Sequence, residues 1–344
     1  MDRLVELTAE QRRETVNTRQ LWVAWELAVR RRAGYSGSMV WRNPPRGGEY
    51  LYRINPRAGS GQRNERSMGL RAPETERLHE EFHAGRDEAE LAVETLSTKL
   101  RRQARLNRAL DLGRVPEITS RILRRFHREN LLGGTLVVAG TNAIYAYEAA
   151  AGVHVASDLL ATADLDILLD ARAKLKFSHD GRQPGRVIDI LASVDRTFRS
   201  VSNRHRAVNN NGFMVELIKP EPRPPWRAER EGLGEGDMAA AMIANMRWIE
   251  SAPKFDTVAI GTDGAPVPMT APDPRAFSVY KLNMGTRDPT RDPLKRKRDV
   301  QQAEIVASIV RDYLPQLPFS DDQLKNFPKE IVDHARTRLD PFFS

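Results

Sequence analysis

Two acidic residues stand one position apart in the apolar stretch ADLDILLD, residues 163–170. Side chains of a β-strand alternate between its two faces, so Asp164 and Asp166 would project from the same face, roughly 7 Å apart. Two carboxylates at this separation repel each other unless a cation lies between them, and Mg²⁺ prefers carboxylate oxygen. The apolar neighbours predict burial, where an unpaired carboxylate is costly. This setting favours a divalent metal site over a chance pair of acids.

A third acid has a similar setting. Glu216 lies in the apolar run GFMVELI, residues 212–218, which reads as another strand. If this strand is an antiparallel neighbour of the first, its carboxylate lies beside the pair. Three such carboxylates suggest two metal ions, which in known enzymes activate an attacking oxygen, hold a triphosphate and stabilise in-line displacement at phosphorus.

A triphosphate also needs hydrogen-bond donors. The strand-like run GGTLVVAG, residues 133–140, ends at Gly140, and Thr141 begins a stretch with helical character. A glycine-ended strand that enters a helix offers free backbone N–H groups, and Thr141 adds a hydroxyl. We predict phosphate binding here; the alternative is a plain strand-to-helix turn with Thr141 as the N-cap.

The order of these residues along the chain resembles a known signature. Gly140–Thr141, then Asp164 and Asp166, then Glu216 on a later strand look like the active site of the DNA polymerase β-type nucleotidyltransferase superfamily. The stretches GTNAIYAYEAAAG to ATADLDILLD, and PDPRAFSVYKLNMGTRDPTRDPLKRKRDVQQAEIV, resemble a bacterial standalone family akin to the minimal AbiEii-type enzymes. The interval before the first acid is longer than usual in the superfamily, so GVHVASDLLAT is expected to loop out.

The resemblance implies roles for these residues. Gly140 and Thr141 would bind the phosphates of a nucleoside triphosphate, the donor substrate. Asp164, Asp166 and Glu216 would hold two Mg²⁺ ions, and Glu216 would also act as the base toward an acceptor hydroxyl.

Further basic residues enter through the same resemblance. Lys281 matches a lysine that such enzymes aim at the triphosphate, although an exposed helix lysine is an equal alternative. The run LKRKRDVQQAEIV supplies Lys295 and Arg298, which could hold nucleotide or RNA phosphates, and Asp299, which could orient Lys281. A solvated helix face is the alternative for this run.

The net charge fits either an anionic partner or an ordinary solvated surface, and the composition excludes other chemistry. The chain has 344 residues, a formal charge of +8 and no cysteine, which excludes disulfides and thiolate nucleophiles. Neither a P-loop nor a dinucleotide-binding or nucleophile-elbow motif is present. The N-terminus lacks the apolar stretch of a signal peptide, and no segment approaches the roughly 20 apolar residues that cross a bilayer. We therefore expect a cytoplasmic protein with no membrane association.

Basic and aromatic features outside the predicted core favour RNA as the acceptor. They could follow a phosphate backbone, with aromatic side chains stacking on bases. Solvated helix faces and a packed hairpin are the alternative. The features are the arginine-rich segments 99–108 and 121–128, the loop residues Arg63, Arg66 and Arg71, and the aromatic residues Trp41, Tyr50 and Tyr52.

A competing motif indicates a different enzyme class. Residues 79–83 read HEEFH, a literal H-E-x-x-H, in which His79 and His83 would bind zinc and Glu80 would be the base of a metalloprotease. Zincin helices are apolar around this motif, whereas RLHEEFHAGRDEAE is charged on every side. The charged context therefore argues against a metalloprotease.

The pattern of elements predicts an α/β (α+β) fold. Together with the resemblance, it implies a nucleotidyltransferase core with a mixed, mostly antiparallel sheet, preceded by helices and a hairpin and followed by a helical domain. The expected domains are residues 1–130, 131–225 and 226–344. The expected helices are 8–33, 73–112, 117–132, 141–152, 186–193, 239–248, 274–285, 293–313 and 321–338. Hairpins are expected at 38–54 and around 262–264, a basic loop at 56–72, further strands at 172–177 and 212–218, and a strap at 220–226.

The predicted reaction is transfer of a nucleoside monophosphate from a nucleoside triphosphate to an acceptor hydroxyl, with release of pyrophosphate. An RNA acceptor such as a tRNA 3′ end would suit a toxin or phage-defence factor with a possible cognate antitoxin, as the resemblance suggests. A protein side chain or a small molecule is an alternative acceptor, and a non-catalytic RNA-binding module is the alternative outside catalysis.

Overall fold

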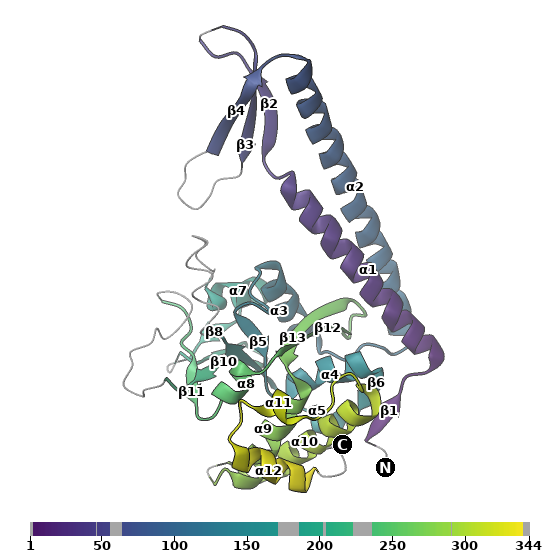
Figure 1. The fold of residues 1–344 in the computed structure, drawn as a ribbon, viewed down its shortest axis with the longest axis vertical. Helices are drawn as coiled ribbons and strands as arrows, with labels where there is room; N and C mark the ends of the chain where they lie inside the picture. The colour runs from purple at the N-terminus through teal and green to yellow at the C-terminus, as the bar shows by residue number, and fades with distance from the viewer. Residues whose placement is uncertain are drawn as a thin grey trace. The chain divides into compact units, whose positions relative to one another are not determined.

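The computed structural model describes residues 3–45, 47–55, 64–170, 186–201, 204–222, 236–289 and 291–339. The chain divides into two compact units (Figure 1). The core unit comprises Met1–Thr15 and Asn107–Ser344, and the hairpin unit comprises Val16–Leu106. These two units are defined by contacts in space. The division of the sequence into three domains stays a prediction.

The hairpin unit consists of two long helices and a three-stranded antiparallel sheet in the order β2-β3-β4. Met39 and Leu51 of the sheet are buried against Phe82. The helices are α1 (Ala9–Gly34), which begins in the core unit, and α2 (Pro73–Ala109). The strands are β2 (Ser38–Arg42), β3 (Tyr50–Asn55) and β4 (Asn64–Leu70).

Strand β4 corrects the sequence-based expectation of a loop over residues 56–72. The sequence of β4, NERSMGL, holds no β-branched or aromatic residue, so local propensity does not reveal a strand. The segment is extended because it pairs with β3 and because Met68 packs on the buried cluster. Residues 56–63 of the expected loop lie outside the described residues.

The core unit is built on a six-stranded mixed sheet in the order β5-β7-β10-β9-β8, with β11 also paired to β10. Three of its pairings are antiparallel and two, β7–β10 and β10–β11, are parallel. This confirms the predicted α/β fold class with a mixed, mostly antiparallel sheet. The strands are β5 (Leu136–Val138), β7 (Asp164–Leu169), β8 (Arg199–Ser200), β9 (Arg206–Val208), β10 (Met214–Pro220) and β11 (Ala241–Ile243).

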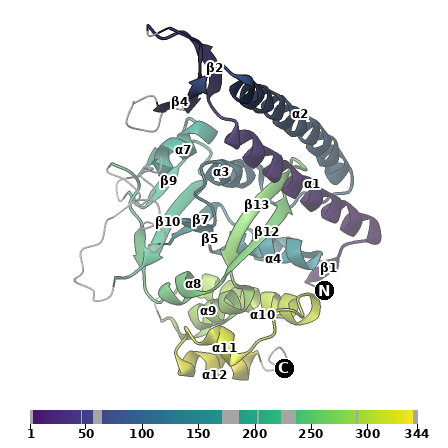
Figure 2. The same ribbon diagram turned by 45° about the horizontal axis from the view of Figure 1, so that its top comes forward.

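Two hydrophobic clusters cover the two faces of this sheet. Helices lie on both sides of it in the ribbon (Figure 2). Leu165 and Leu217 face the layer that contains α3 (Glu117–Arg128), α4 (Ile144–Ala151) and α7 (Val187–Val194). Leu168 and Ile218 face the C-terminal helices. These are α8 (Arg247–Ser251), α9 (Pro274–Arg287), α10 (Pro293–Tyr313), α11 (Asp321–Leu324) and α12 (Lys329–Arg338).

Smaller elements complete the core unit. The expected hairpin is present as β12 (Lys254–Ile260) and β13 (Pro266–Pro272), paired antiparallel. Strand β1 (Leu4–Glu6) pairs antiparallel with β6 (Val153–Val155). The remaining short helices are η1 (Thr141–Ala143) and α5 (Ser157–Leu160).

Two expectations for the core unit need correction. The segment before the acid strand does not simply loop out, because it forms β6 and α5. The helix expected over 239–248 is replaced by β11 and the short α8, since the backbone of Ala241–Ile243 pairs with the edge of β10. The strand expected at 172–177 lies outside the described residues, as does the strap beyond residue 222.

Candidate active site

Adjacent strands bring the three acids to one face of the core sheet. Strand β7 begins at Asp164, and Asp166 is two residues further on the same face. Strand β10 pairs with β7 in parallel rather than antiparallel, and its register sets Glu216 directly beside Asp166. The acids share this face with Leu168 and Ile218, and this face of the sheet is the one that packs against the C-terminal helices.

The side chains of these acids have different partners. The Thr162 hydroxyl donates to the Asp164 carboxylate. The Arg206 guanidinium on β9 lies 3.1 Å and 3.3 Å from the two carboxylate oxygens of Glu216. Burial and then the neighbouring Asp164 carboxylate raise the pKa of Asp166 to about 6, although Lys281 opposes this. The raised pKa reflects first the burial of this carboxylate and then the negative charge beside it, and a bound cation would offset both.

Within the described ranges, no three histidine, aspartate or glutamate side chains are grouped so that they could hold a metal ion. Glu216 is engaged by Arg206, and Asp164 by Thr162. The chemistry of the donor set nevertheless fits a hard divalent ion, because it consists of carboxylate oxygens on one sheet face. Metal binding would therefore require these side chains to change partners.

The loop after β5 lies tightly against the acid strand. Gly140 has φ 59° and ψ −154°, a backbone region that only glycine adopts readily. A Cβ atom at this position would lie 2.0 Å from Asp166 Oδ2. The Ala139 N–H donates to the Asp166 carbonyl oxygen at 2.9 Å, and Asn142 Nδ2 donates to the Asp164 carbonyl oxygen at 2.8 Å. The predicted phosphate loop and the strand that carries Asp164 and Asp166 are thus in direct contact.

Helix α10 holds the hydroxyl of this loop. Gln302 is fully buried, and its Nε2 donates to Thr141 Oγ1 at 3.2 Å and to the Leu159 carbonyl oxygen at 2.7 Å. Thr141 is not the N-cap considered in the sequence analysis, because Gly140 precedes η1 in that position. Gln302 was not among the residues predicted from the sequence, where its signal is a polar side chain next to the largely apolar run AEIVASIV.

A buried ionic cluster lies between α9 and α10. Lys281 Nζ lies 2.7 Å from Asp299 Oδ1, and Arg291 Nε lies 2.7 Å from Asp299 Oδ2. Burial lowers the pKa of Lys281 against the opposing effect of Asp299. Both basic groups lower the pKa of Asp166, so the cluster lies within electrostatic reach of the acids.

Asp299→Ala is expected to destabilise the protein by about 3–5 kcal/mol, because Lys281 would remain buried without its counter-ion. Urea denaturation measures this change. The double variant Lys281→Met/Asp299→Leu should recover part of the loss, since it leaves less uncompensated charge. Asp312→Ala, which breaks an exposed pair with Arg311, is the control and should cost under about 1 kcal/mol. Equal losses from the two alanine variants would contradict the expectation.

The other basic residues of α10 are placed less centrally. Arg298 Nη1 donates to the carbonyl oxygen of Ala161, close in sequence to the acid strand. Lys295 is exposed, and its backbone N–H is capped by the Asp292 side chain. The structure therefore places the three acids on two neighbouring strands, with Gly140 against Asp166. Thr141 is the next residue of the loop, Lys281 and Asp299 pair nearby, and Lys295 lies at the surface.

The HEEFH motif lies on α2 of the hairpin unit. The rings of His79 and His83 are 4.4 Å apart, and His79 also packs against Trp41. His83 Nε2 lies 3.0 Å from the carbonyl oxygen of Met39, a contact that needs a proton on this nitrogen and so removes it as a metal ligand. The geometry favours a packed helix–sheet contact over a zinc site.

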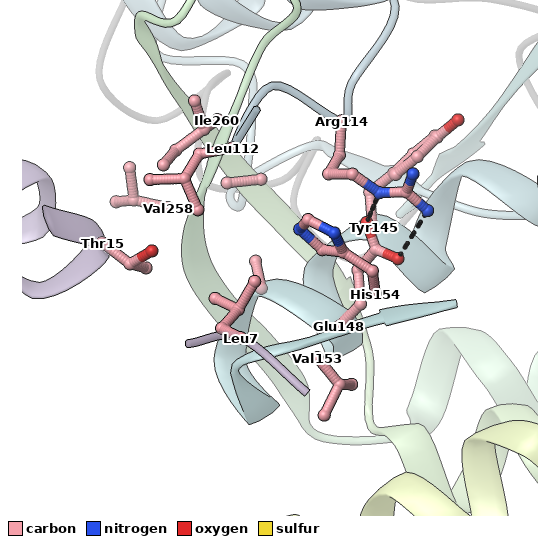
Figure 3. Close-up of a pocket in the computed structure, with 12 residues that line it drawn as sticks. Leu7, Thr15, Leu112, Arg114, Tyr145, Glu148, Val153, His154, Val258 and Ile260 are labelled. Carbon is pink, nitrogen blue, oxygen red and sulfur yellow. Dashed lines mark hydrogen bonds and ion pairs between the residues drawn. The ribbon is translucent and has the colours of Figure 1, made fainter. Parts of the chain in front are cut away.

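A pocket elsewhere in the core unit surrounds a buried ion pair (Figure 3). Arg114 Nε lies 2.9 Å from Glu148 Oε1, and Arg114 Nη2 donates to the Val155 carbonyl oxygen at 2.6 Å. Tyr145 and His154 lie beside this pair (Figure 3). None of the predicted site residues lines this pocket, and the partners of Arg114 indicate a structural role in joining α4 to β6.

His154→Gln is expected to reduce the acid sensitivity of folding. Burial, and then the Arg114 guanidinium, lower the pKa of His154 from 6.5 to about 4. Between these two pH values the unfolded chain binds a proton that the folded chain excludes. The free energy of unfolding of the wild type therefore decreases as the pH is lowered, by up to about 3 kcal/mol. Urea denaturation at pH 7 and at pH 4.5 should give a smaller difference for the variant. An unchanged difference would contradict this assignment.

Comparison with known proteins identifies the family. A profile of a nucleotidyltransferase family matches residues 117–327, which is more than half of the chain. The chain therefore belongs to this nucleotidyltransferase family, whose members transfer nucleotidyl groups from a nucleoside triphosphate and usually require a divalent metal. No curated protein matches the chain, and no solved structure matches it. The helices of the described ranges include none with the length and apolar character needed to cross a membrane.

Proposed function

We propose that this protein transfers a nucleoside monophosphate from a nucleoside triphosphate to an acceptor hydroxyl, with an active site of the DNA polymerase β type. The observation that carries the proposal is the register that sets Glu216 beside Asp166, with the backbone of Gly140 against the Asp166 carboxylate. Carboxylates and a glycine turn at one sheet face are the groups that a metal-bound triphosphate requires.

The proposed reaction assigns a role to each group. An oxygen of the acceptor attacks the α-phosphorus, the bond from this phosphorus to the bridging oxygen breaks, and pyrophosphate leaves. Glu216 accepts the proton of the acceptor hydroxyl. Held by Asp164, Asp166 and Glu216, two Mg²⁺ ions would supply positive charge that offsets the triphosphate. The backbone of Gly140 and the hydroxyl of Thr141 bind phosphate oxygens.

Basic residues assist nucleotide binding in this proposal. Lys281, oriented by Asp299 at 2.7 Å, contributes positive charge toward the triphosphate. Arg298 and the exposed Lys295 bind more distal phosphates of the nucleotide or of the acceptor. These roles rest on charge and on position in α9 and α10.

The proposed acceptor is RNA, for which a tRNA 3′ end is the specific candidate. The net charge of +8 supports a polyanionic acceptor. Such an activity would suit a growth-arresting toxin or phage-defence factor held in check by an antitoxin, acting in the cytoplasm. A protein side chain or a small hydroxylated molecule would be the alternative acceptor.

The test is incorporation of label from each of the four α-³²P-labelled triphosphates into whole-cell RNA, and separately into whole-cell protein, with Mg²⁺. Label in RNA that disappears on chelation of Mg²⁺ supports the full proposal. Label in protein alone keeps nucleotidyl transfer and removes the RNA acceptor. Label in neither fraction would leave a small-molecule acceptor or the non-catalytic RNA-binding module.

A further inference from the structure

Arginine 206 stands directly opposite the third acid of the site. In the antiparallel pairing of β9 with β10, Arg206 is the register partner of Glu216. Its Nη2 lies 3.1 Å from Oε1 and 3.3 Å from Oε2 of Glu216. The guanidinium thus spans both oxygens of a carboxylate that the proposed function assigns to metal binding.

The two side chains differ in how firmly they are held. The Arg206 side chain is 45% exposed, whereas that of Glu216 is 20% exposed. An exposed guanidinium can leave its partner for water or for another anion at little cost, because few packing contacts are lost. Glu216 stays fixed by the strand, so an exchange of partners would move the arginine.

Other basic groups near the acids are engaged differently. Lys281 and Arg291 both pair with Asp299, which has no proposed metal role. Arg298 donates to a backbone carbonyl. Arg206 is therefore the basic residue whose described contact occupies a carboxylate of the proposed metal site.

We propose that Arg206 is a displaceable counter-cation that competes with divalent metal for Glu216. Without metal, the guanidinium offsets the negative charge of Glu216, next to Asp166. A divalent ion that bound Glu216 would take its place, and the freed guanidinium would then be available to an anion such as a phosphate group. The arginine would thus disfavour binding of metal alone and favour its arrival with a nucleotide. This inference rests on the proposed function for the assignment of Glu216.

The test measures binding of Mn²⁺ alone to the full chain, by electron paramagnetic resonance of the free ion. Arg206→Ala should bind Mn²⁺ about tenfold more tightly than wild type, because a competing charge some 3 Å from the carboxylate is gone. Arg206→Lys should lie between the two. Arg206→Ala/Glu216→Gln should lose the gain, because the contested carboxylate is no longer charged.

Arg199→Ala is the matched control. Arg199 lies on the neighbouring strand β8 and donates to the backbone carbonyls of Arg196 and Phe198. Its replacement by alanine lowers the net charge by the same one unit but breaks none of these carboxylate contacts. Mn²⁺ affinity in this control should stay within about twofold of wild type. If Arg206→Ala does not fold, Arg206→Gln and Arg206→Lys provide the same comparison.

The inference is overturned if removal of Arg206 leaves Mn²⁺ affinity no higher than in the Arg199 control, or if Mn²⁺ binds to none of the variants. Its failure is distinguishable from that of the proposed function, because the titration contains no nucleotide. Tighter Mn²⁺ binding without nucleotidyl transfer would retain the competition and remove the enzyme activity. Nucleotidyl transfer without tighter Mn²⁺ binding in Arg206→Ala would retain the enzyme activity and remove the competition.

Discussion

Asp166→Asn is expected to lower nucleotidyl transfer at least a thousandfold while the protein stays folded. Asp166 is the central acid, with Asp164 two residues away on its strand and Glu216 beside it on the next. Asparagine keeps the shape but removes the charge that would hold a metal. A thousandfold loss corresponds to about 4 kcal/mol of transition-state stabilisation, a magnitude common for a central electrostatic group.

The same substitution should not reduce stability. Asp166 lies between like charges, so removal of its charge is expected to leave the free energy of unfolding unchanged or slightly higher. Asp158→Asn, an exposed acid on α5, is the control and should retain activity. Rates with labelled triphosphate and urea denaturation would be measured on all three proteins. A variant at position 166 that keeps more than a tenth of the wild-type rate would remove Asp166 from the active site.

Much of the fold could be predicted because its main elements carry local signals. Helices α2 and α10 are long, begin at a proline and are rich in helix-forming residues, so both were expected within a few residues of their bounds. The turn at residues 262–264 contains the dipeptide Asp-Gly, which favours turns. Strands β4 and β11 lack such signals, since their extended conformation comes from pairing with β3 and β10.

The candidate site shows the same division between local and distant information. Charged residues inside apolar runs, such as Asp166 and Glu216, stand out in the sequence because burial of an unpaired charge is costly. The parallel pairing of their strands cannot be read from the sequence in this way, because strand order depends on the whole chain. Arg206 and Gln302 were missed for a related reason: each is an ordinary polar residue until a partner from another element identifies it. The contact of Lys281 with Asp299 was one of two alternatives that the sequence left open, and the metal and phosphate roles stay predictions.

Gly140→Ala is expected to lower nucleotidyl transfer about a hundredfold or more, through two separable effects. Alanine adopts φ 59° with ψ −154° only at a cost of about 1–3 kcal/mol. Its Cβ would also meet Asp166 Oδ2 at 2.0 Å, closer than non-bonded atoms approach, so the carboxylate or the loop would have to move. A displacement of about 1 Å at a catalytic group can cost a hundredfold in rate.

Gly212→Ala separates the two effects. Gly212 also has a positive φ, of 78°, but a Cβ atom there would meet nothing within 4 Å. Both variants should therefore lose stability through backbone strain, while only Gly140→Ala should lose most of its activity. Urea denaturation and transfer rates on the two proteins test this difference. Equal activities would mean that the contact between the Gly140 backbone and Asp166 is structural, and that the phosphate loop has to be sought elsewhere.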